Sequence, residues 1–366
     1  MRLAFTSSRG AVAFAMLVLL VVLSPVLFGK HLLPPRAEAY ASQNWTKGAY
    51  PWIRHQIFED TNSFDIVFIG SSHLMWAVDT PYVEQKLTEQ LGHPAVVNTF
   101  GWGGDGYEAV YFIAKDLLAR HQVKAMVIYD EAAGLHSFEP PPFWFRYGED
   151  APDLSGLAWG EKTRLYAAAM VGVPRNLLGL CRPSRPADLA ATNSIQSAYH
   201  SPNPVSLLGA VSGAMAYHAN LSTYAPLTEF APANGMLPSD ACVYSELTRS
   251  NFVFSEEAWR EVDRNFAGKL VELARSHGCK LVLLHLPVRS DAHRRGIQEN
   301  HFWRESAQAG VPVLGIPPEK FFAGLSEEQC DRLYSDPGHL SQNGQRYFTP
   351  LITPALLKLY EETSPF

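Results

Sequence analysis

The pattern of hydrophobic and polar positions alternates between two periods along the chain. Short runs rich in Val, Ile and Phe, typical of buried strands, alternate with longer segments in which apolar residues recur every three or four positions, as they do in helices. Strands separated by helices predict an α/β fold with a mainly parallel sheet that helices cover on both faces. The predicted strands are residues 65–69, 95–98, 123–129, 281–286 and 311–316, and the predicted helices are residues 81–91, 107–119, 255–277 and 344–361.

The middle of the chain, residues 135–250, does not follow this pattern. It is rich in Pro, Gly, Ser and Ala, and it is too long for a plain loop in a compact domain. We therefore expect an insertion that walls or covers a cleft, within one domain that spans residues 61–366. Residues 31–60, which contain Pro34, Pro35 and several aromatic residues, are expected to form a connector.

The first 30 residues predict export from the cytoplasm. Arg2 and Arg9 precede an uncharged apolar run, residues 11–29, which is close to the roughly 20 residues that a transmembrane helix needs. The run is long for a cleaved signal peptide, usually about 7–15 residues, although the small residues around Ala37 suit a cleavage site. An uncleaved anchor predicts a single-pass membrane protein with its main domain on the periplasmic side, and a cleaved signal predicts a secreted protein.

Composition narrows the classes of partner and cofactor. The 366-residue chain is 47 % hydrophobic, which is enough for a sizeable core, and carries a formal charge of −6 without a Lys/Arg stripe, so nucleic acid is not an expected partner. The four cysteines lack the close spacing of a zinc site and no His-x-x-x-His pair occurs, so no metal or other cofactor is expected. Cys279 leads into a predicted strand and is expected to be a buried thiol. Export would permit a disulfide between Cys181 and Cys242, because disulfides form in oxidising compartments.

Two short motifs carry the groups that a serine nucleophile needs. Gly70-Ser71-Ser72-His73 follows the first core strand, and Asp336-Pro337-Gly338-His339-Leu340 precedes the last helix. Near neutral pH a serine hydroxyl needs an imidazole to accept its proton and a carboxylate to orient that imidazole. A spacing of three residues sets Asp336 and His339 on the same side of a turn. Each motif taken alone also fits a purely structural role, because Gly-Ser-Ser is a common helix cap and Asp336 can cap a turn beside an exposed His339.

Together the motifs resemble those of the SGNH/GDSL hydrolase superfamily. Gly70-Ser71-Ser72 resembles its first block, Asn98-Thr99-Phe100-Gly101-Trp102-Gly103-Gly104-Asp105 resembles its glycine-bearing second block, and Asp336-Pro337-Gly338-His339 resembles its final Asp-x-x-His block. The three blocks occur in the order of that superfamily. The resemblance covers about residues 65–130 and 280–360, and it implies a three-layer α/β/α sandwich of flavodoxin-like topology.

The resemblance also implies a role for each motif residue. Ser72 would be the nucleophile, His339 the general base and Asp336 the carboxylate that orients it. The backbone N–H groups of Ser72 and Gly101, together with Asn98 of the second block, would form the oxyanion hole. No metal and no cofactor take part in this chemistry.

The chain departs from the superfamily pattern at the third block, which normally supplies an Asn to the oxyanion hole. The corresponding strand exit, Tyr129-Asp130-Glu131-Ala132-Ala133-Gly134, contains none, and loss of one such donor typically lowers the rate by ~10²–10³. Divergent membrane-anchored members, such as alginate-acetylation proteins and D-alanyl-transfer proteins of teichoic acid synthesis, are similar to this chain in their N-terminal segment and Ser…Asp-x-x-His arrangement.

The resemblance therefore implies a serine esterase or O-acyltransferase that acts on an acylated glycan, a lipid or a small ester in the cell envelope, within a polysaccharide-modification complex. The acceptor, water or a sugar hydroxyl, stays open because both reactions share the acyl-enzyme step. The alternative is a catalytically silent SGNH-like domain that binds glycan in such a complex, a hypothesis motivated by the missing Asn.

Overall fold

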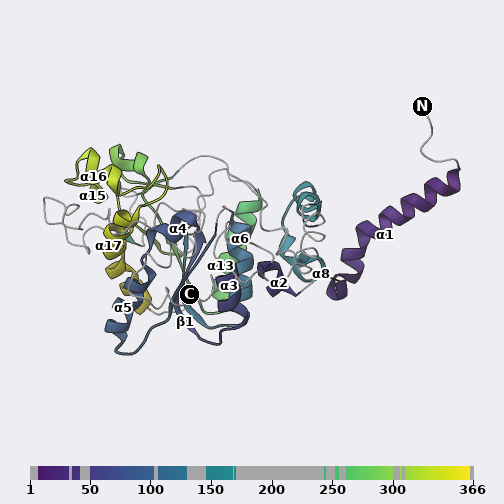
Figure 1. The fold of residues 1–366 in the computed structure, drawn as a ribbon, viewed down its shortest axis with the longest axis horizontal. Helices are drawn as coiled ribbons and strands as arrows, with labels where there is room; N and C mark the ends of the chain where they lie inside the picture. The colour runs from purple at the N-terminus through teal and green to yellow at the C-terminus, as the bar shows by residue number, and fades with distance from the viewer. Residues whose placement is uncertain are drawn as a thin grey trace, which may run out of the picture. The chain divides into compact units, whose positions relative to one another are not determined.

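The structure is a computed structural model of the whole chain, and Figure 1 shows its elements. It describes residues 7–32, 35–41, 50–102, 106–129, 146–167, 169, 243–244, 252–254, 261–299, 306 and 310–362. The chain divides into two compact units, one from residues 1–42 and 138–183 and the other from residues 43–137 and 184–366. The elements are α1 (Ser8–Leu32), α2 (Arg36–Ala41), α3 (Tyr50–Phe58), β1 (Phe64–Ser71), α4 (Ser72–Ala77), α5 (Thr80–Leu91), β2 (Val97–Trp102), α6 (Tyr107–Leu118), β3 (Val123–Tyr129), α8 (Tyr147–Asp150), η2 (Ala151–Leu154), β4 (Val243–Tyr244), β5 (Phe252–Phe254), α13 (Glu261–Ser276), β6 (Lys280–Leu284), η6 (Arg289–His293), β7 (Ile297–Glu299), β8 (Val313–Gly315), α15 (Pro318–Phe321), α16 (Glu327–Arg332) and α17 (Gln342–Glu361).

The first unit contains α1, α2, α8 and η2. A salt bridge of 2.5 Å joins Arg36 of α2 to the fully buried carboxylate of Asp150 in α8, and α1 packs against α8. Large apolar side chains of α1 are exposed, among them Val12, Phe14 and Leu17. The sequence pattern predicted that the N-terminal run crosses a membrane. Among the residues that the structure describes, no helix is both long enough and apolar enough to span a bilayer.

The second unit confirms the predicted α/β class. Its main sheet has the strand order β2-β1-β3-β6-β8-β4, in which the first five strands are parallel and β4 pairs antiparallel with β8. β1 lies between β2 and β3, with Ser71 of β1 opposite Trp102 of β2 and Gly70 opposite Tyr129 of β3. β5 and β7 form a separate parallel pair. The carboxyl ends of β1, β2 and β3 therefore meet at one edge of the sheet.

The predicted second strand is shifted in the structure. Residues 95–98 were expected to be extended, whereas β2 begins at Val97. The reason is local: the backbone N–H groups of Ala95 and Val96 donate to the side chains of Thr88 and Asp65 at 3.0 and 2.9 Å. These two donors are satisfied before the strand ladder starts, so the ladder begins two residues later.

Helices cover both faces of the sheet. Figure 1 shows α4, α5 and α17 on one side of β1 and α3, α6 and α13 on the other. Ile66 and Phe68 of β1 belong to the apolar cluster that includes α4, α5 and α17, and Val67 and Ile69, also fully buried, point to the opposite face because strand side chains alternate. α6 packs against α13 on that second face.

Helix α3 lies inside the segment that the sequence assigned to a connector, residues 31–60. Its apolar residues at helical spacing, including Trp52, Ile53 and Ile57, are almost completely buried, and α3 packs against β2. Trp52 of this segment therefore contributes to the core of the second unit. The predicted insertion, residues 135–250, falls mostly outside the described residues.

Candidate active site

The strand β1 runs directly into the short helix α4, without an intervening loop. Ser71 is the last residue of β1 and the N-cap of α4, and Ser72 is the first helical residue. The chain leaves β1 to form β2 on one side and later β3 on the other side. This strand end is therefore the topological switch point of the sheet, where open α/β sheets bind ligands.

Two glycines allow α4 to turn so tightly over the strand ends. A Cβ atom on Gly70 would lie 2.3 Å from the backbone oxygen of Tyr129 and 3.0 Å from the Leu74 side chain. A Cβ on Gly101, opposite Gly70 in β2, would lie 2.7 Å from the Cβ of Met75 in α4. Any larger residue at either position would push α4 away from the sheet, and Ser72 with it.

The second half of the site is a tight turn between α16 and α17. The Asp336 Oδ1 atom accepts hydrogen bonds from the backbone N–H groups of Gly338 and His339, at 2.9 and 2.8 Å. The turn is closed by a bridge between Tyr334 and Leu340 and by the N–H of Ser335, which donates to the His339 carbonyl at 2.9 Å. Asp336 therefore caps the turn, which is the structural role that the sequence allowed for it. The same carboxylate also contacts the His339 ring.

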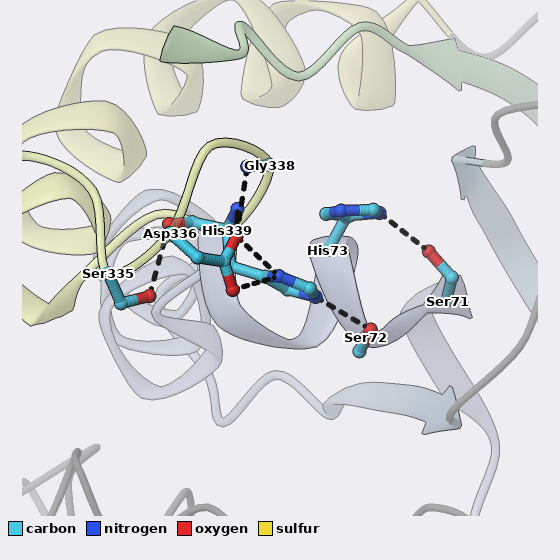
Figure 2. A network of polar contacts seen from close by, with 7 residues as sticks. All are labelled: Ser71, Ser72, His73, Ser335, Asp336, Gly338 and His339. Atoms are coloured by element: carbon cyan, nitrogen blue, oxygen red, sulfur yellow. Dashed lines mark hydrogen bonds and ion pairs between the residues drawn. The ribbon is translucent and has the colours of Figure 1, made fainter.

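The structure brings Ser72, His339 and Asp336 together (Figure 2). The Ser72 Oγ atom lies 2.8 Å from the His339 Nε2 atom, across 267 residues of sequence. The Nδ1 atom of the same ring lies 2.8 Å from Asp336 Oδ2 and 3.0 Å from Oδ1. A carboxylate can only accept, so Nδ1 carries the hydrogen and Nε2 is left to accept the proton of the Ser72 hydroxyl.

Helix α17 holds the turn against α4. The Gln345 side chain donates to the Val78 carbonyl at 3.1 Å, and the Thr349 hydroxyl donates to the Ala77 carbonyl at 3.2 Å and accepts from the Asp79 N–H at 2.9 Å. These side chains lie on the helix that begins directly after the turn, and they bind the end of the helix that begins with Ser72. The distance between Ser72 and His339 is thus set by two rigid elements and not by loops alone.

The turn is also tied to the segment after β6. The Arg289 backbone N–H donates to the Pro337 carbonyl at 3.2 Å, and the Tyr334 hydroxyl donates to the Pro287 carbonyl at 2.9 Å. The Arg289 side chain is in turn held by Glu327 and Asp331 of α16. Segments from three parts of the chain therefore fix the turn in place.

The electrostatics favour an ionised Asp336 beside a partly enclosed His339. The side chain of His339 is 19 % exposed and that of Asp336 is 43 % exposed. Partial burial by itself raises the pKa of Asp336, but the N–H groups of His339 and Gly338 and the neighbouring His339 ring outweigh it and hold this pKa below the ordinary value. Asp336 is consequently a carboxylate at neutral pH, able to stabilise a protonated His339.

The structure does not bring Asn98 to this site, which corrects the oxyanion-hole expectation. Its side chain is buried and donates from Nδ2 to Gln56 Oε1 of α3 at 2.6 Å. Asn98 pairs with Val67, on the sheet face opposite α4, because side chains alternate along β2. Gly101 does lie at the strand end, opposite Gly70, beside α4.

The sequence analysis did not identify one residue of the site, His73. The His73 ring stacks on the His339 ring, with 4.1 Å between the centroids and 23° between the planes, and its Nδ1 atom lies 3.4 Å from the Ser71 Oγ atom. His73 belongs to the same motif as Ser72, so its position directly after Ser72 was a signal. Its stacking on a ring 266 positions away in the sequence was not visible there.

Several expectations concern residues outside those described. They are the third-block strand exit after Tyr129, the second-block residues 103–105, and Cys181 and Cys242. Cys279 is a free buried thiol as predicted, and burial raises its pKa to about 12. Within the described ranges, no group of three His, Cys, Asp or Glu side chains is arranged to hold a metal ion.

Comparisons with known proteins identify no relative of this chain. The chain has no significant match to a protein-family model, to a curated protein or to a solved structure.

Proposed function

We propose that the protein is a serine-dependent ester hydrolase or O-acyltransferase of the SGNH type that works through an acyl-enzyme. The observation that carries the proposal is the contact chain Ser72 Oγ to His339 Nε2 at 2.8 Å and His339 Nδ1 to Asp336 Oδ2 at 2.8 Å. Hydroxyl, imidazole and carboxylate meet at hydrogen-bonding distance in the order that nucleophilic catalysis by serine needs.

The reaction follows from the position of the protons. The Ser72 oxygen attacks the carbonyl carbon of an ester while its proton moves to His339 Nε2, and the imidazolium is stabilised by the Asp336 carboxylate. His339 then returns that proton to the departing alcohol, which leaves an ester on Ser72. Water or a second hydroxyl gives its proton to His339 and attacks this ester. His339 then returns that proton to the Ser72 oxygen, and the acyl group leaves Ser72 as an acid or as a new ester.

The negative charge that develops on the carbonyl oxygen needs hydrogen-bond donors. Ser72 is the first residue of α4, so its backbone N–H has no acceptor within the helix, and it is the first donor of the proposed oxyanion hole. Gly101 lies at the end of the neighbouring strand and offers the second backbone N–H of the proposal. With Asn98 engaged by Gln56, the oxyanion hole of this protein is proposed to consist of main-chain donors.

The substrate class follows from the proposed location. Arg2 and Arg9 followed by the apolar residues 11–29 favour export, and the esters available outside the cytoplasm include O-acylated glycans and lipids of the envelope. We therefore propose an acylated envelope polymer or lipid as the acyl donor or acceptor, with an envelope polysaccharide-modification complex as the setting.

A serine-directed fluorophosphonate tests the proposal directly. Wild-type protein should be labelled on Ser72 and should hydrolyse p-nitrophenyl acetate, whereas Ser72→Ala should lose both activities. The matched control is Ser63→Ala, because Ser63 is exposed in the loop before β1 and its removal should change neither rate. Intact-mass detection of an acyl adduct would add direct proof.

Two outcomes contradict the proposal. Labelling of Ser72→Ala at the wild-type rate would show that another residue reacts. A folded wild-type protein that is neither labelled nor acylated, yet binds oligosaccharide, would instead show a glycan-binding domain without catalysis.

A further inference from the structure

The mechanism leaves one ring of the site without a role. His73 follows Ser72 directly in α4, and its ring lies face to face with that of His339, with centroids 4.1 Å apart and planes inclined by 23° (Figure 2). The Ser72 hydroxyl and the His73 ring therefore contact the same imidazole, one at its Nε2 edge and the other on its face. A ring held at its edges by Asp336 and Ser72 can still tilt about the line that joins them, and a flat surface against one face restricts that tilt.

His73 is itself held in place from three sides. Its Nδ1 atom lies 3.4 Å from the hydroxyl of Ser71 in β1. The Tyr129 ring of β3 meets it edge-on, with centroids 6.0 Å apart and planes inclined by 84°. The third neighbour is the turn that carries His339, where a Cβ on Gly338 would lie 2.7 Å from His73 Nε2. The glycine between Asp336 and His339 thus makes room for the His73 ring.

We propose that His73 is a positioning residue: it backs the His339 ring so that Nε2 stays directed at the Ser72 hydroxyl. The inference rests on the proposed serine chemistry. The face-to-face contact at 4.1 Å, together with the Ser71 and Tyr129 contacts that hold His73 itself, limits the tilt of the His339 ring.

The experiment compares His73→Ala with His73→Gln. Alanine removes the flat surface, whereas glutamine keeps a planar, neutral group of similar reach. At the pH optimum we expect His73→Ala to lower kcat and the rate of fluorophosphonate labelling by at least ~10-fold with little change in KM, because small misplacements of a catalytic group have effects of this size. His73→Gln should stay within about threefold of wild type. His93→Ala, in an exposed loop, is the control and should react as wild type does.

The split between kcat and KM, together with rescue by the planar glutamine side chain, gives a readout that a purely structural role would not change. An unchanged kcat in His73→Ala, or equal losses of kcat in both variants, would overturn the proposal.

A double-mutant cycle checks the packing against Gly338. Gly338→Ala places a methyl group 2.7 Å from His73 Nε2 and should lower kcat/KM in the wild-type background. In the His73→Ala background the methyl group has room, so the additional loss should be several-fold smaller. Additive effects would contradict the stacking argument. A wild-type protein that shows no serine reactivity at all would refute the proposed function, and this inference with it.

Discussion

The replacement of Asp336 by Asn gives a sharp prediction, because it changes one atom and reverses the hydrogen-bond pattern of the site. The amide oxygen is expected at the Oδ1 position, where the N–H groups of Gly338 and His339 donate at 2.9 and 2.8 Å. The amide nitrogen then takes the Oδ2 position, 2.8 Å from His339 Nδ1. Two donors cannot face each other, so Nδ1 must give up its hydrogen and accept.

The consequence is a histidine in the wrong tautomer. With its hydrogen on Nε2, the His339 ring donates to the Ser72 hydroxyl at the 2.8 Å contact and cannot accept its proton. The same exchange in a serine-protease triad lowers kcat by about 10⁴, which corresponds to about 5.4 kcal/mol of transition-state stabilisation. We expect a loss of this order here, with KM little changed because the exchange leaves the shape of the site intact.

The assay is the hydrolysis of p-nitrophenyl acetate, with fluorophosphonate labelling as a second measure of the Ser72 nucleophile. Asp60→Asn is the matched control, because Asp60 also accepts two backbone N–H bonds, from Thr61 and Asn62, in an exposed turn before β1, at the end of that strand remote from Ser72. This variant should keep wild-type activity. If Asp336→Asn retained more than a tenth of wild-type kcat, the assigned role of the carboxylate would be refuted.

Two further predictions concern the scaffold of the site. Burial raises the pKa of Asp79, the N-cap of α5, to about 6, against partial compensation by the Tyr82 N–H and the charge of Arg346. The folded state thus holds this proton more tightly than the unfolded chain, so the contribution of Asp79 to stability falls as pH rises from about 4 to 6. Asp79→Asn, which keeps an acceptor for the cap, should be more stable than wild type at pH 7 by up to about 3 kcal/mol in urea unfolding, and a difference that did not shrink towards pH 4 would contradict the assignment. Gly70→Ala places a methyl group 2.3 Å from the Tyr129 carbonyl; it should lower the free energy of unfolding by about 3 kcal/mol and slow labelling of Ser72, and wild-type behaviour in both measurements would refute the close-packing argument.

Much of the fold was predictable because strand and helix patterns are properties of contiguous residues. The periodicity identified the strand at 123–129 to the residue and the helix at 107–119 to within one residue of its observed end. It missed the short helix α4, whose six residues are too few to show a helical period. It also left α3 in a connector, because burial of Trp52 and Ile53 depends on a sheet that forms from later residues.

The sequence by itself determined which reactive side chains are available to the candidate site. A hydroxyl placed after a core strand, and a carboxylate three residues before an imidazole, are local facts that composition and spacing reveal. Tertiary structure alone decided how these groups meet: the 2.8 Å contact between Ser72 and His339 joins residues 267 positions apart and depends on α17 packing against α4. It also turned Asn98 towards Gln56 and set His73 against His339. Such contacts arise from the packing of whole elements, and no neighbouring residue in the chain encodes them.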